Sequence, residues 1–209
     1  AEALGWMVKM GEHVPAEAEM LAWLIANKSA MERLLSKLVN IDSPSNYDAG
    51  LDAVAGELAA FLDENNVATR RLGTDPGAII LQAAVTATCH AAPVLLLGHM
   101  DTVFPRGTVA QQPFSKTAER LYGPGVADMK AGLVMNAFVL AAFARFGAGA
   151  RPIEGLFTLD EEVASPISRP FIQDAARRAS MVLNAEPGRA NGNVVIERKG
   201  GIVIANLAR

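Results

Sequence analysis

Residues 93–101 read PVLLLGHMD, an apolar run of strand length that ends in a histidine and an aspartate. Other apolar runs of strand length occupy residues 78–85, 153–159 and 181–184. Between the runs, residues 129–146 and 168–178 have the composition of helices, and Ser165 and Ser168 both offer caps for the second one. Strands that alternate with helices predict an α/β layered fold with a largely parallel sheet, whose functional groups lie beyond the carboxyl ends of its strands.

Residues 15–64, which precede all of these apolar runs, predict helices. Apolar side chains between residues 15 and 39 recur at steps of three and four, with an interruption near residues 27–29. The sequence DSPS at residues 42–45 predicts a turn. A further helix is expected over residues 47–64, and its core-facing side chains are Leu51, Val54, Leu58, Phe61 and Leu62.

Composition and charge exclude several classes of protein. Hydrophobic residues make up 51% of the 209-residue chain, which is enough to fill a core and is not typical of disorder. The formal net charge is -3 and no basic tract occurs, so we expect no nucleic acid as a partner. Cys89 is the one cysteine, which excludes an internal disulfide and a zinc site made of cysteines.

Three features of the sequence bear on location. No run of about 18 apolar residues occurs, so we expect no membrane span. The first residues do not read as a signal peptide, and the chain begins with Ala1 rather than Met. A cytoplasmic location is therefore favoured, with a periplasmic one as the alternative if an upstream signal has been removed.

The first candidate site residues are His99 and Asp101, at the end of the apolar run in residues 93–101. Two residues apart on an extended strand end, they share one face. A metal-binding imidazole commonly donates its second N–H to a carboxylate, and Asp101 is placed for that role. Without other ligands, however, a His-x-Asp sequence more often marks a structural or surface position.

A second candidate is Asp128, in the sequence YGPGVADMK at residues 122–130. The glycines of this motif permit tight turns and a close approach of the backbone to a ligand. Because Asp128 directly precedes the Ala-rich helix, the alternative role is that of an N-cap. The glycines do not continue into Gly-x-Gly-x-x-Gly, which disfavours a nucleotide-binding protein.

Carboxylates follow two more apolar runs. Residues 158–162 read TLDEE, where Glu161 and Glu162 follow a third acidic residue, and the three would repel one another unless solvent or a metal relieves the repulsion. Glu186 ends the run LNAE at residues 183–186. One histidine and several carboxylates at strand ends form a mixed nitrogen and oxygen ligand set that suits zinc, with cobalt or manganese as substitutes. A bridging carboxylate in such a set can hold two metals.

Four motifs in order resemble those of the glutamate carboxypeptidase family of two-zinc metallopeptidases: HMDTV at residues 99–103, YGPGVADMK at 122–130, DEE at 160–162 and EP at 186–187. This family includes acetylornithine deacetylase and succinyl-diaminopimelate desuccinylase, and the likeness is closest to the bacterial folate-cleaving glutamate carboxypeptidases. It extends from about residue 34 to residue 201, over almost the whole chain.

The resemblance implies a three-layer α/β catalytic domain with a mostly parallel central sheet. Residues 16–196 would form its N-terminal portion, after an irregular segment at residues 1–15. Residues 197–209 would begin a lid and dimerisation domain, so the catalytic domain is expected to be incomplete at its C-terminus. A homodimer is expected only where that lid domain is present.

For the metal site, the resemblance implies two zinc ions. His99 and Glu186 would bind the first ion, Glu162 would bind the second, and Asp128 would bridge both. The family also has a histidine ligand to the second zinc, and neither of the other two histidines of this chain matches its position. The chain is therefore expected to bind at most one zinc firmly and to have little activity alone.

For catalysis, the resemblance implies that Glu161 is the general base, that Asp101 orients His99, and that the Asp128–Met129 peptide bond is cis. The implied reaction is hydrolysis of a peptide or N-acyl amide bond in a small-molecule or peptide substrate with a free carboxylate. Its product would be a C-terminal amino acid such as glutamate. Aminoacylase, dipeptidase, deacetylase or desuccinylase activity and a non-catalytic remnant of the family are the alternatives.

Overall fold

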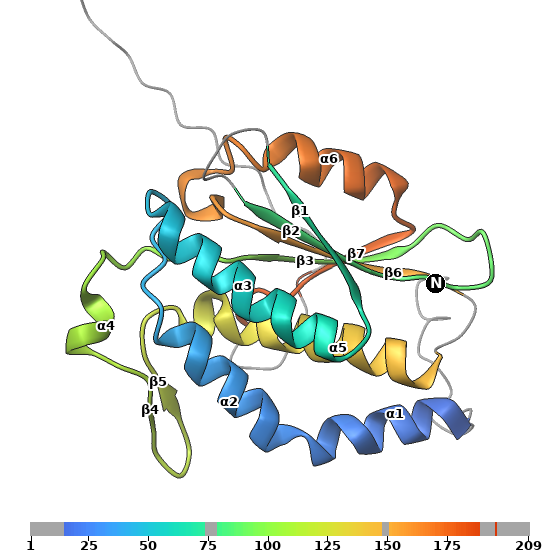
Figure 1. Ribbon diagram of the computed structural model, residues 1–209, viewed down its shortest axis with the longest axis horizontal. Helices are drawn as coiled ribbons and strands as arrows, with labels where there is room; N and C mark the ends of the chain where they lie inside the picture. Colours follow the sequence, from blue (N-terminus) through green and yellow to red (C-terminus); the bar gives the residue numbers. More distant parts are fainter. Residues whose placement is uncertain (1–14, 74–78, 148–150, 189–194, 196–209) are drawn as a thin grey trace, which may run out of the picture.

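A five-stranded sheet forms the centre of the computed structural model, which describes residues 15–73, 79–147, 151–188 and 195. Its strands follow the order β1-β2-β6-β3-β7 (Figure 1). The bounds of these strands are Ala68–Leu72 (β1), Ile80–Val85 (β2), Ile153–Thr158 (β6), Val94–His99 (β3) and Met181–Asn184 (β7). Helices lie on both faces of the sheet, so the molecule has three layers and the predicted α/β class is confirmed.

The sheet is mixed, and its parallel part carries the candidate site. Strand β3 pairs in parallel with β6 on one side and with β7 on the other. The carboxyl ends of these three strands therefore meet at one edge of the sheet. The antiparallel part comes from β2, which pairs with β6, and from β1, which pairs with β2. Strand β1 is not among the strands that the sequence predicts.

Helices α3 and α5 pack against one face of the sheet, and α1 and α2 lie outside them (Figure 1). Helix α6 lies on the opposite face (Figure 1). The bounds of the helices are Pro15–Ala26 (α1), Lys28–Val39 (α2), Asp48–Glu64 (α3), Ala131–Phe146 (α5) and Arg169–Arg178 (α6). The predicted interruption between α1 and α2 is confirmed at Asn27, whose side-chain amide donates a hydrogen bond to the Trp23 carbonyl at 2.8 Å.

Short elements connect these helices and strands. They are α4 (Thr108–Gln111), the paired two-residue strands β4 (Ser115–Lys116) and β5 (Leu121–Tyr122), the irregular π-type turn η1 (Val126–Lys130) and the 3-10 turn η2 (Glu161–Val163). Turn η1 leads directly into α5, and η2 follows β6. Both turns contain candidate site residues, which they hold close to the edge of the sheet where the parallel strands end.

Helix α5 is buried around most of its circumference, because it lies between the sheet and the outer helices. Phe138 is 1% exposed, and its ring centroid lies 4.5 Å from that of Phe61 and 5.9 Å from that of Trp23. The helical stretch Val126–Phe146 is long and apolar enough to cross a membrane by length and composition alone. However, 61% of its most apolar window is buried inside the protein, as in the core helix of a layered domain.

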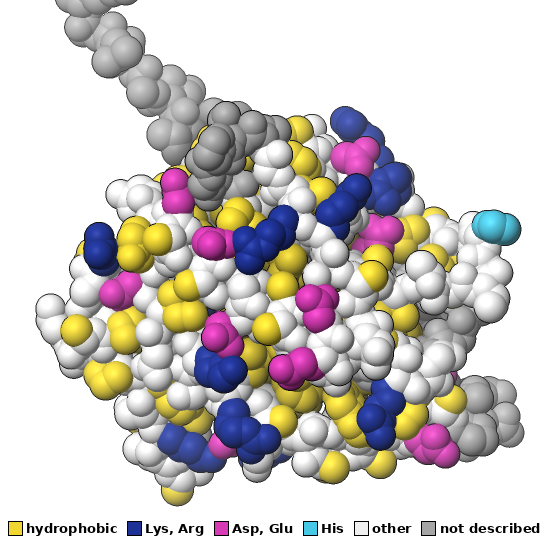
Figure 2. Space-filling model, viewed as in Figure 1, with side chains coloured by type: hydrophobic (Ala, Val, Ile, Leu, Met, Phe, Trp, Pro, Cys, Tyr) yellow, Lys and Arg dark blue, Asp and Glu magenta, His cyan; other side chains and the backbone are white. Residues whose placement is uncertain are grey.

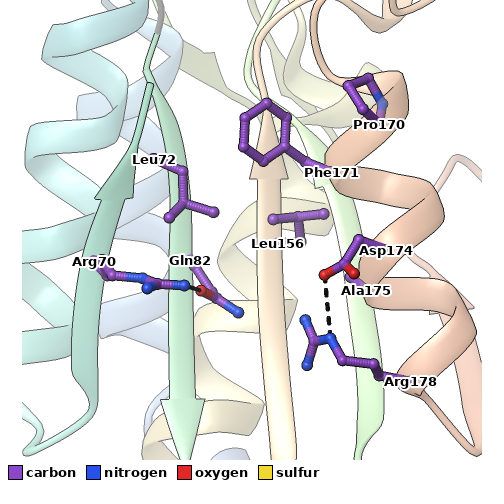
Figure 3. A pocket seen from close by; sticks show the side chains of 9 residues that line it. All are labelled: Arg70, Leu72, Gln82, Leu156, Pro170, Phe171, Asp174, Ala175 and Arg178. Atoms are coloured by element: carbon purple, nitrogen blue, oxygen red, sulfur yellow. Dashed lines mark hydrogen bonds and ion pairs between the residues drawn. The ribbon is translucent and has the colours of Figure 1, made fainter. Parts of the chain in front are cut away.

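The surface carries mixed charge and a groove on the α6 side. On the face drawn in Figure 2, basic and acidic side chains are interspersed rather than gathered by sign. A groove of about 510 Å³ lies between α6 and strands β1, β2 and β6 (Figure 3). Its floor includes Leu72, Leu156 and Phe171, and Arg70 and Arg178 flank it. The predicted site residues do not line this groove, so it is separate from the candidate site.

Two predictions about domain boundaries lie outside the described residues. Of the segment predicted to be irregular, residues 1–15, only Pro15 is described, and it begins α1. The predicted start of a lid domain, residues 197–209, lies wholly outside them. Both therefore stay predictions.

The substitution Phe138→Ala tests the packing of α5. It removes a ring that contacts both Phe61 and Trp23, and we expect it to lower the free energy of unfolding by about 3–5 kcal/mol. Urea unfolding followed by circular dichroism measures the loss. Met135→Ala on the same helix is the control, because Met135 is 56% exposed, and it should cost about 0.5 kcal/mol or less. Equal losses in the two variants would contradict the packing described here.

Candidate metal centre

Four segments that are far apart in the sequence meet at the carboxyl edge of the parallel strands. His99 is the last residue of β3, and Glu161 begins η2 shortly after β6. Glu186 follows the end of β7, and Asp128 lies in η1 ahead of α5. This edge is where parallel sheets place their functional groups.

The Nε2 atom of His99 faces a group of carboxylate oxygens. It lies 3.3 Å from Asp128 Oδ1, 3.6 Å from Glu186 Oε1 and 3.9 Å from Glu161 Oε2. One atom each of His99, Asp128 and Glu186 lie within 4.8 Å of one another, a spacing that could hold a metal ion. The imidazole is 1% exposed and the Asp128 side chain is 57% exposed, so the group has a buried floor and an open rim.

Asp101 lies on the other side of the imidazole. The Nδ1 atom of His99 is 2.9 Å from the Asp101 carbonyl oxygen and 3.2 Å from its carboxylate Oδ1. Both of these partners are acceptors, so Nδ1 carries a proton and a neutral imidazole has its lone pair on Nε2. This is the contact through which a carboxylate fixes the tautomer of a metal-binding histidine.

The Asp101 carboxylate is fully buried and accepts hydrogen bonds from several chain segments. Besides His99, its donors are the backbone N–H groups of Glu161 and Glu162, each at 3.1 Å, and the hydroxyl of Ser45 at 2.6 Å. Burial raises the pKa of this carboxyl, but the hydrogen bonds from His99 and Ser45 outweigh burial and hold the pKa below its usual value. Asp101 is therefore a buried anion. The sequence does not identify Ser45, because no local pattern connects residue 45 with residue 101.

The three carboxylates in residues 160–162 have different environments. Asp160 is 1% exposed, and its carboxylate accepts hydrogen bonds from the backbone N–H groups of Ile167 at 2.6 Å and Ser168 at 3.3 Å. Asp160 therefore binds the start of α6 and does not face the metal group. The prediction that Ser168 caps this helix is wrong for its side chain, which makes no capping hydrogen bond. Glu161 and Glu162 are the two acidic residues left at the site.

Glu162 lies near the group but is not one of its three members. Partial burial raises the pKa of its carboxyl, His99 lowers it, and the negative charge of Asp128 raises it again, so that the pKa is above its usual value. Of the four predicted metal ligands, the structure thus brings three together and leaves Glu162 beside them.

Met129 packs beneath the metal group and contacts the backbone of His99. The Asp128–Met129 peptide bond is cis, as the family resemblance implies. Met129 is fully buried, and its Sδ accepts a hydrogen bond from the backbone N–H of His99 at 3.1 Å. The ladder between β3 and β7 ends at Leu97 and Asn184, so on the β7 side the sulfur takes the place of a strand partner for the His99 N–H.

Lys130 fixes the end of η1 to a different part of the fold. Its side chain is 1% exposed, and its Nζ donates a hydrogen bond to the Ile41 carbonyl at 2.7 Å. Burial lowers the pKa of this amine to about 8, against the opposing effect of Asp42. The contact attaches η1 to the connection between α2 and α3.

Glu186 is positioned by a close approach of two backbones. A Cβ atom on Gly132 would lie 2.2 Å from the carbonyl oxygen of Ala185, which is closer than side-chain atoms approach. Only glycine therefore lets the first turn of α5 pack against the backbone that precedes Glu186.

The charges of the group favour a cation. Burial lowers the pKa of the His99 imidazole, but Asp101, Glu186 and Glu161 outweigh burial and raise it to about 9. Burial raises the pKa of the Glu186 carboxyl, and repulsion from Asp128 and Glu161 raises it further against the effect of His99. A divalent ion would replace the proton held by the imidazole and relieve this repulsion. One nitrogen and several oxygen ligands fit zinc.

Comparison with known proteins places the chain in a family of metallopeptidases. The sequence profile of peptidase family M20/M25/M40 matches residues 95–199. Carboxypeptidase G2 of Pseudomonas sp. (strain RS-16) is 33% identical over 181 residues, which cover 85% of this chain and 43% of that protein. Acetylornithine deacetylase of Salmonella paratyphi B is 37% identical over 109 residues, which cover 49% of this chain and 28% of that protein. The chain thus spans less than half the length of these curated relatives.

Solved structures share the fold. Human carnosine dipeptidase 1 superposes with a TM-score of 0.69 at 14% identity, over 82% of this chain and 41% of that one. The resemblance drawn from the four sequence motifs is confirmed, since all four lie within the segment that the family profile matches. Because that match covers half of the chain and includes every residue of the metal group, the chain belongs to peptidase family M20/M25/M40.

Proposed function

We propose that this chain carries the metal-binding part of a hydrolase that cleaves a peptide or N-acyl amide bond. The observation that supports this most strongly is the convergence of His99 Nε2 with carboxylates of Asp128 and Glu186 at the end of the parallel strands. Family membership supports the same reaction class. When bound, a divalent metal supplies a Lewis acid for the scissile carbonyl and a water that is nucleophilic near neutral pH.

The residues that would hold the metal follow from the three-residue group and, for the second ion, from the family resemblance. His99, Asp128 and Glu186 would bind the first ion, and Asp128 would also bind a second ion together with Glu162. Zinc suits one imidazole and several carboxylates, and cobalt or manganese could substitute. Asp101 would keep the imidazole in the tautomer that directs Nε2 toward the ion.

Glu161 is the proposed general base. Its side chain is 51% exposed, and its Oε2 lies 3.9 Å from His99 Nε2, so it can reach both the metal group and solvent. It would take a proton from the attacking water as the C–O bond forms. It would then return that proton to the nitrogen as the C–N bond breaks, which yields a carboxylic acid and an amine.

The proposed substrate is a small molecule or peptide with a free carboxylate, such as an N-acyl or peptidyl glutamate. The similarity to carboxypeptidase G2 supports a C-terminal amino acid as the leaving group. The similarity to acetylornithine deacetylase supports a second candidate, the removal of an acyl group from an acylated amino acid. Both reactions break the same kind of bond and would use the same residues.

Zinc titration of the metal-free chain tests the metal site. We expect one tight site per chain and at most a weak second one, because only Asp128 and Glu162 of this chain would hold a second ion, whereas the first has a three-residue group. His99→Ala should weaken the tight site at least about 100-fold, since it removes a direct ligand. His90→Ala is the control, because His90 is exposed and outside the group. Two tight sites, or a tight site that survives His99→Ala, would contradict the proposed ligands.

Glu161→Gln tests the general base. It preserves side-chain size but removes the proton acceptor, so kcat for N-acetylglutamate or a glutamate-terminated dipeptide should fall by about 10²–10⁴-fold. Zinc affinity should change little. Glu154→Gln, at the opposite end of β6, should leave kcat unchanged. If the zinc-loaded chain hydrolyses these substrates equally well before and after Glu161→Gln, Glu161 is not the general base and the proposed mechanism is wrong.

Gly132→Ala tests how Glu186 is positioned. The added methyl group must displace the Ala185 carbonyl and with it the neighbouring Glu186, so zinc affinity should fall by about tenfold. Isothermal titration measures the change. Gly56→Ala in α3 is the matched control, because the nearest atom to its new methyl group would be 3.8 Å away. An unchanged affinity in Gly132→Ala would show that Glu186 does not depend on this contact.

A further inference from the structure

Residues 43–45 run alongside the residues that follow β3. The Thr102 backbone N–H donates to the Ser43 carbonyl at 2.9 Å, and Pro44 and Thr102 form an isolated parallel bridge. The Ser43 hydroxyl donates to the Met100 carbonyl at 2.9 Å. This segment is therefore fixed in register, and the register brings Ser45 beside Asp101.

The Ser45 hydroxyl makes the shortest hydrogen bond to the Asp101 carboxylate, 2.6 Å to Oδ2. The same oxygen accepts only one other described hydrogen bond, from the Glu162 backbone N–H at 3.1 Å. Oδ1 faces His99 Nδ1 at 3.2 Å and accepts the Glu161 backbone N–H at 3.1 Å. The carboxylate is thus held between His99 on one oxygen and Ser45 on the other.

Hydrogen bonds to a charged acceptor are stronger than neutral ones, and a carboxylate taken out of water depends on its protein donors. Without Ser45, Oδ2 would retain one backbone donor, and the carboxylate could rotate away from the imidazole. His99 would then lose the partner that orients its ring.

We propose that Ser45 is a positioning residue of the metal site, which acts through Asp101 to set how tightly His99 binds a divalent cation. This inference rests on the proposed function, because it requires that His99 binds metal. Ser45 does not itself touch the metal group. Its effect is carried by a chain of contacts from the Ser45 hydroxyl through the Asp101 carboxylate to the His99 imidazole.

The alternative is that Ser45 only holds its own segment in place. Ser43 separates the two roles, because its hydroxyl binds the same neighbouring segment but contacts a carbonyl and not the carboxylate. A purely structural hydroxyl should give the same result at either position.

The test measures metal affinity and stability separately in four proteins: wild type, Ser45→Ala, Ser45→Thr and Ser43→Ala. Zinc affinity is measured by competition with a chelator, the cobalt form by its visible absorption, and stability by urea unfolding in excess chelator. Ser45→Ala should weaken zinc binding about tenfold and shift the cobalt spectrum, and Ser45→Thr should restore both. Ser43→Ala should lower the stability of the metal-free chain and leave zinc affinity unchanged.

Three outcomes would overturn the inference. Wild-type zinc affinity in Ser45→Ala, or an equal loss of affinity in Ser43→Ala, would leave Ser45 with a structural role while the proposed metal site stands. No rescue by Ser45→Thr would mean that the hydroxyl is not the group responsible. If the wild-type chain bound neither zinc nor cobalt, the proposed function would fail, and this inference would fail with it.

Discussion

A buried negative charge at Asp101 is the constraint on which the candidate site depends. A carboxylate taken out of water is strongly destabilising unless hydrogen-bond donors replace the water. Here the donors come from His99, from Ser45 and from the backbone N–H groups of Glu161 and Glu162. The contacts that keep the charge buried also fix the end of β3, residues 43–45 and the turn after β6 relative to one another. The imidazole of His99 and the backbones of Glu161 and Glu162 are therefore positioned by the same requirement, which is to supply hydrogen bonds to the buried Asp101 carboxylate.

The carboxylates that face the Nε2 side of His99 repel one another, and this repulsion opposes folding. Asp128, Glu161 and Glu186 place like charges around one imidazole, and no lysine or arginine among the described ion pairs joins His99 in offsetting them there. The fold tolerates this because the Asp128 and Glu161 side chains are 57% and 51% exposed, so water screens much of their repulsion. Close backbone packing at Gly132 keeps Glu186 in the group despite the repulsion. A cation site requires carboxylates that repel one another and that the surrounding fold nevertheless keeps close together.

The sequence predicts the buried strands and the convergence of the site, but not its supporting contacts. Strands β3 and β6 are apolar runs buried on both faces, and their parallel pairing brings the motif ends together. Strand β1 reads ATRRL and is an edge strand with no buried residue, so it has no hydrophobic pattern to detect. Residues 160–162 look like one acidic cluster in the sequence, yet the Asp160 carboxylate points inward and binds the start of α6. The sequence could not predict this, because composition does not say which way a carboxylate points. Ser45 and Met129 act through long-range hydrogen bonds, which leave no local periodicity.

The two metal positions implied by the family are unequal in this chain. The first has a buried nitrogen from His99 and oxygens of Asp128 and Glu186 already within one group, so little reorganisation is needed to bind an ion. The second would draw on Asp128 and on Glu162, whose backbone is tied to Asp101 while its carboxylate lies outside that group. An ion there would have to remove water from a largely exposed Asp128, and it would gain only two carboxylates. A first ion would also neutralise part of the charge that attracts a second, so we expect the two positions to fill in that order.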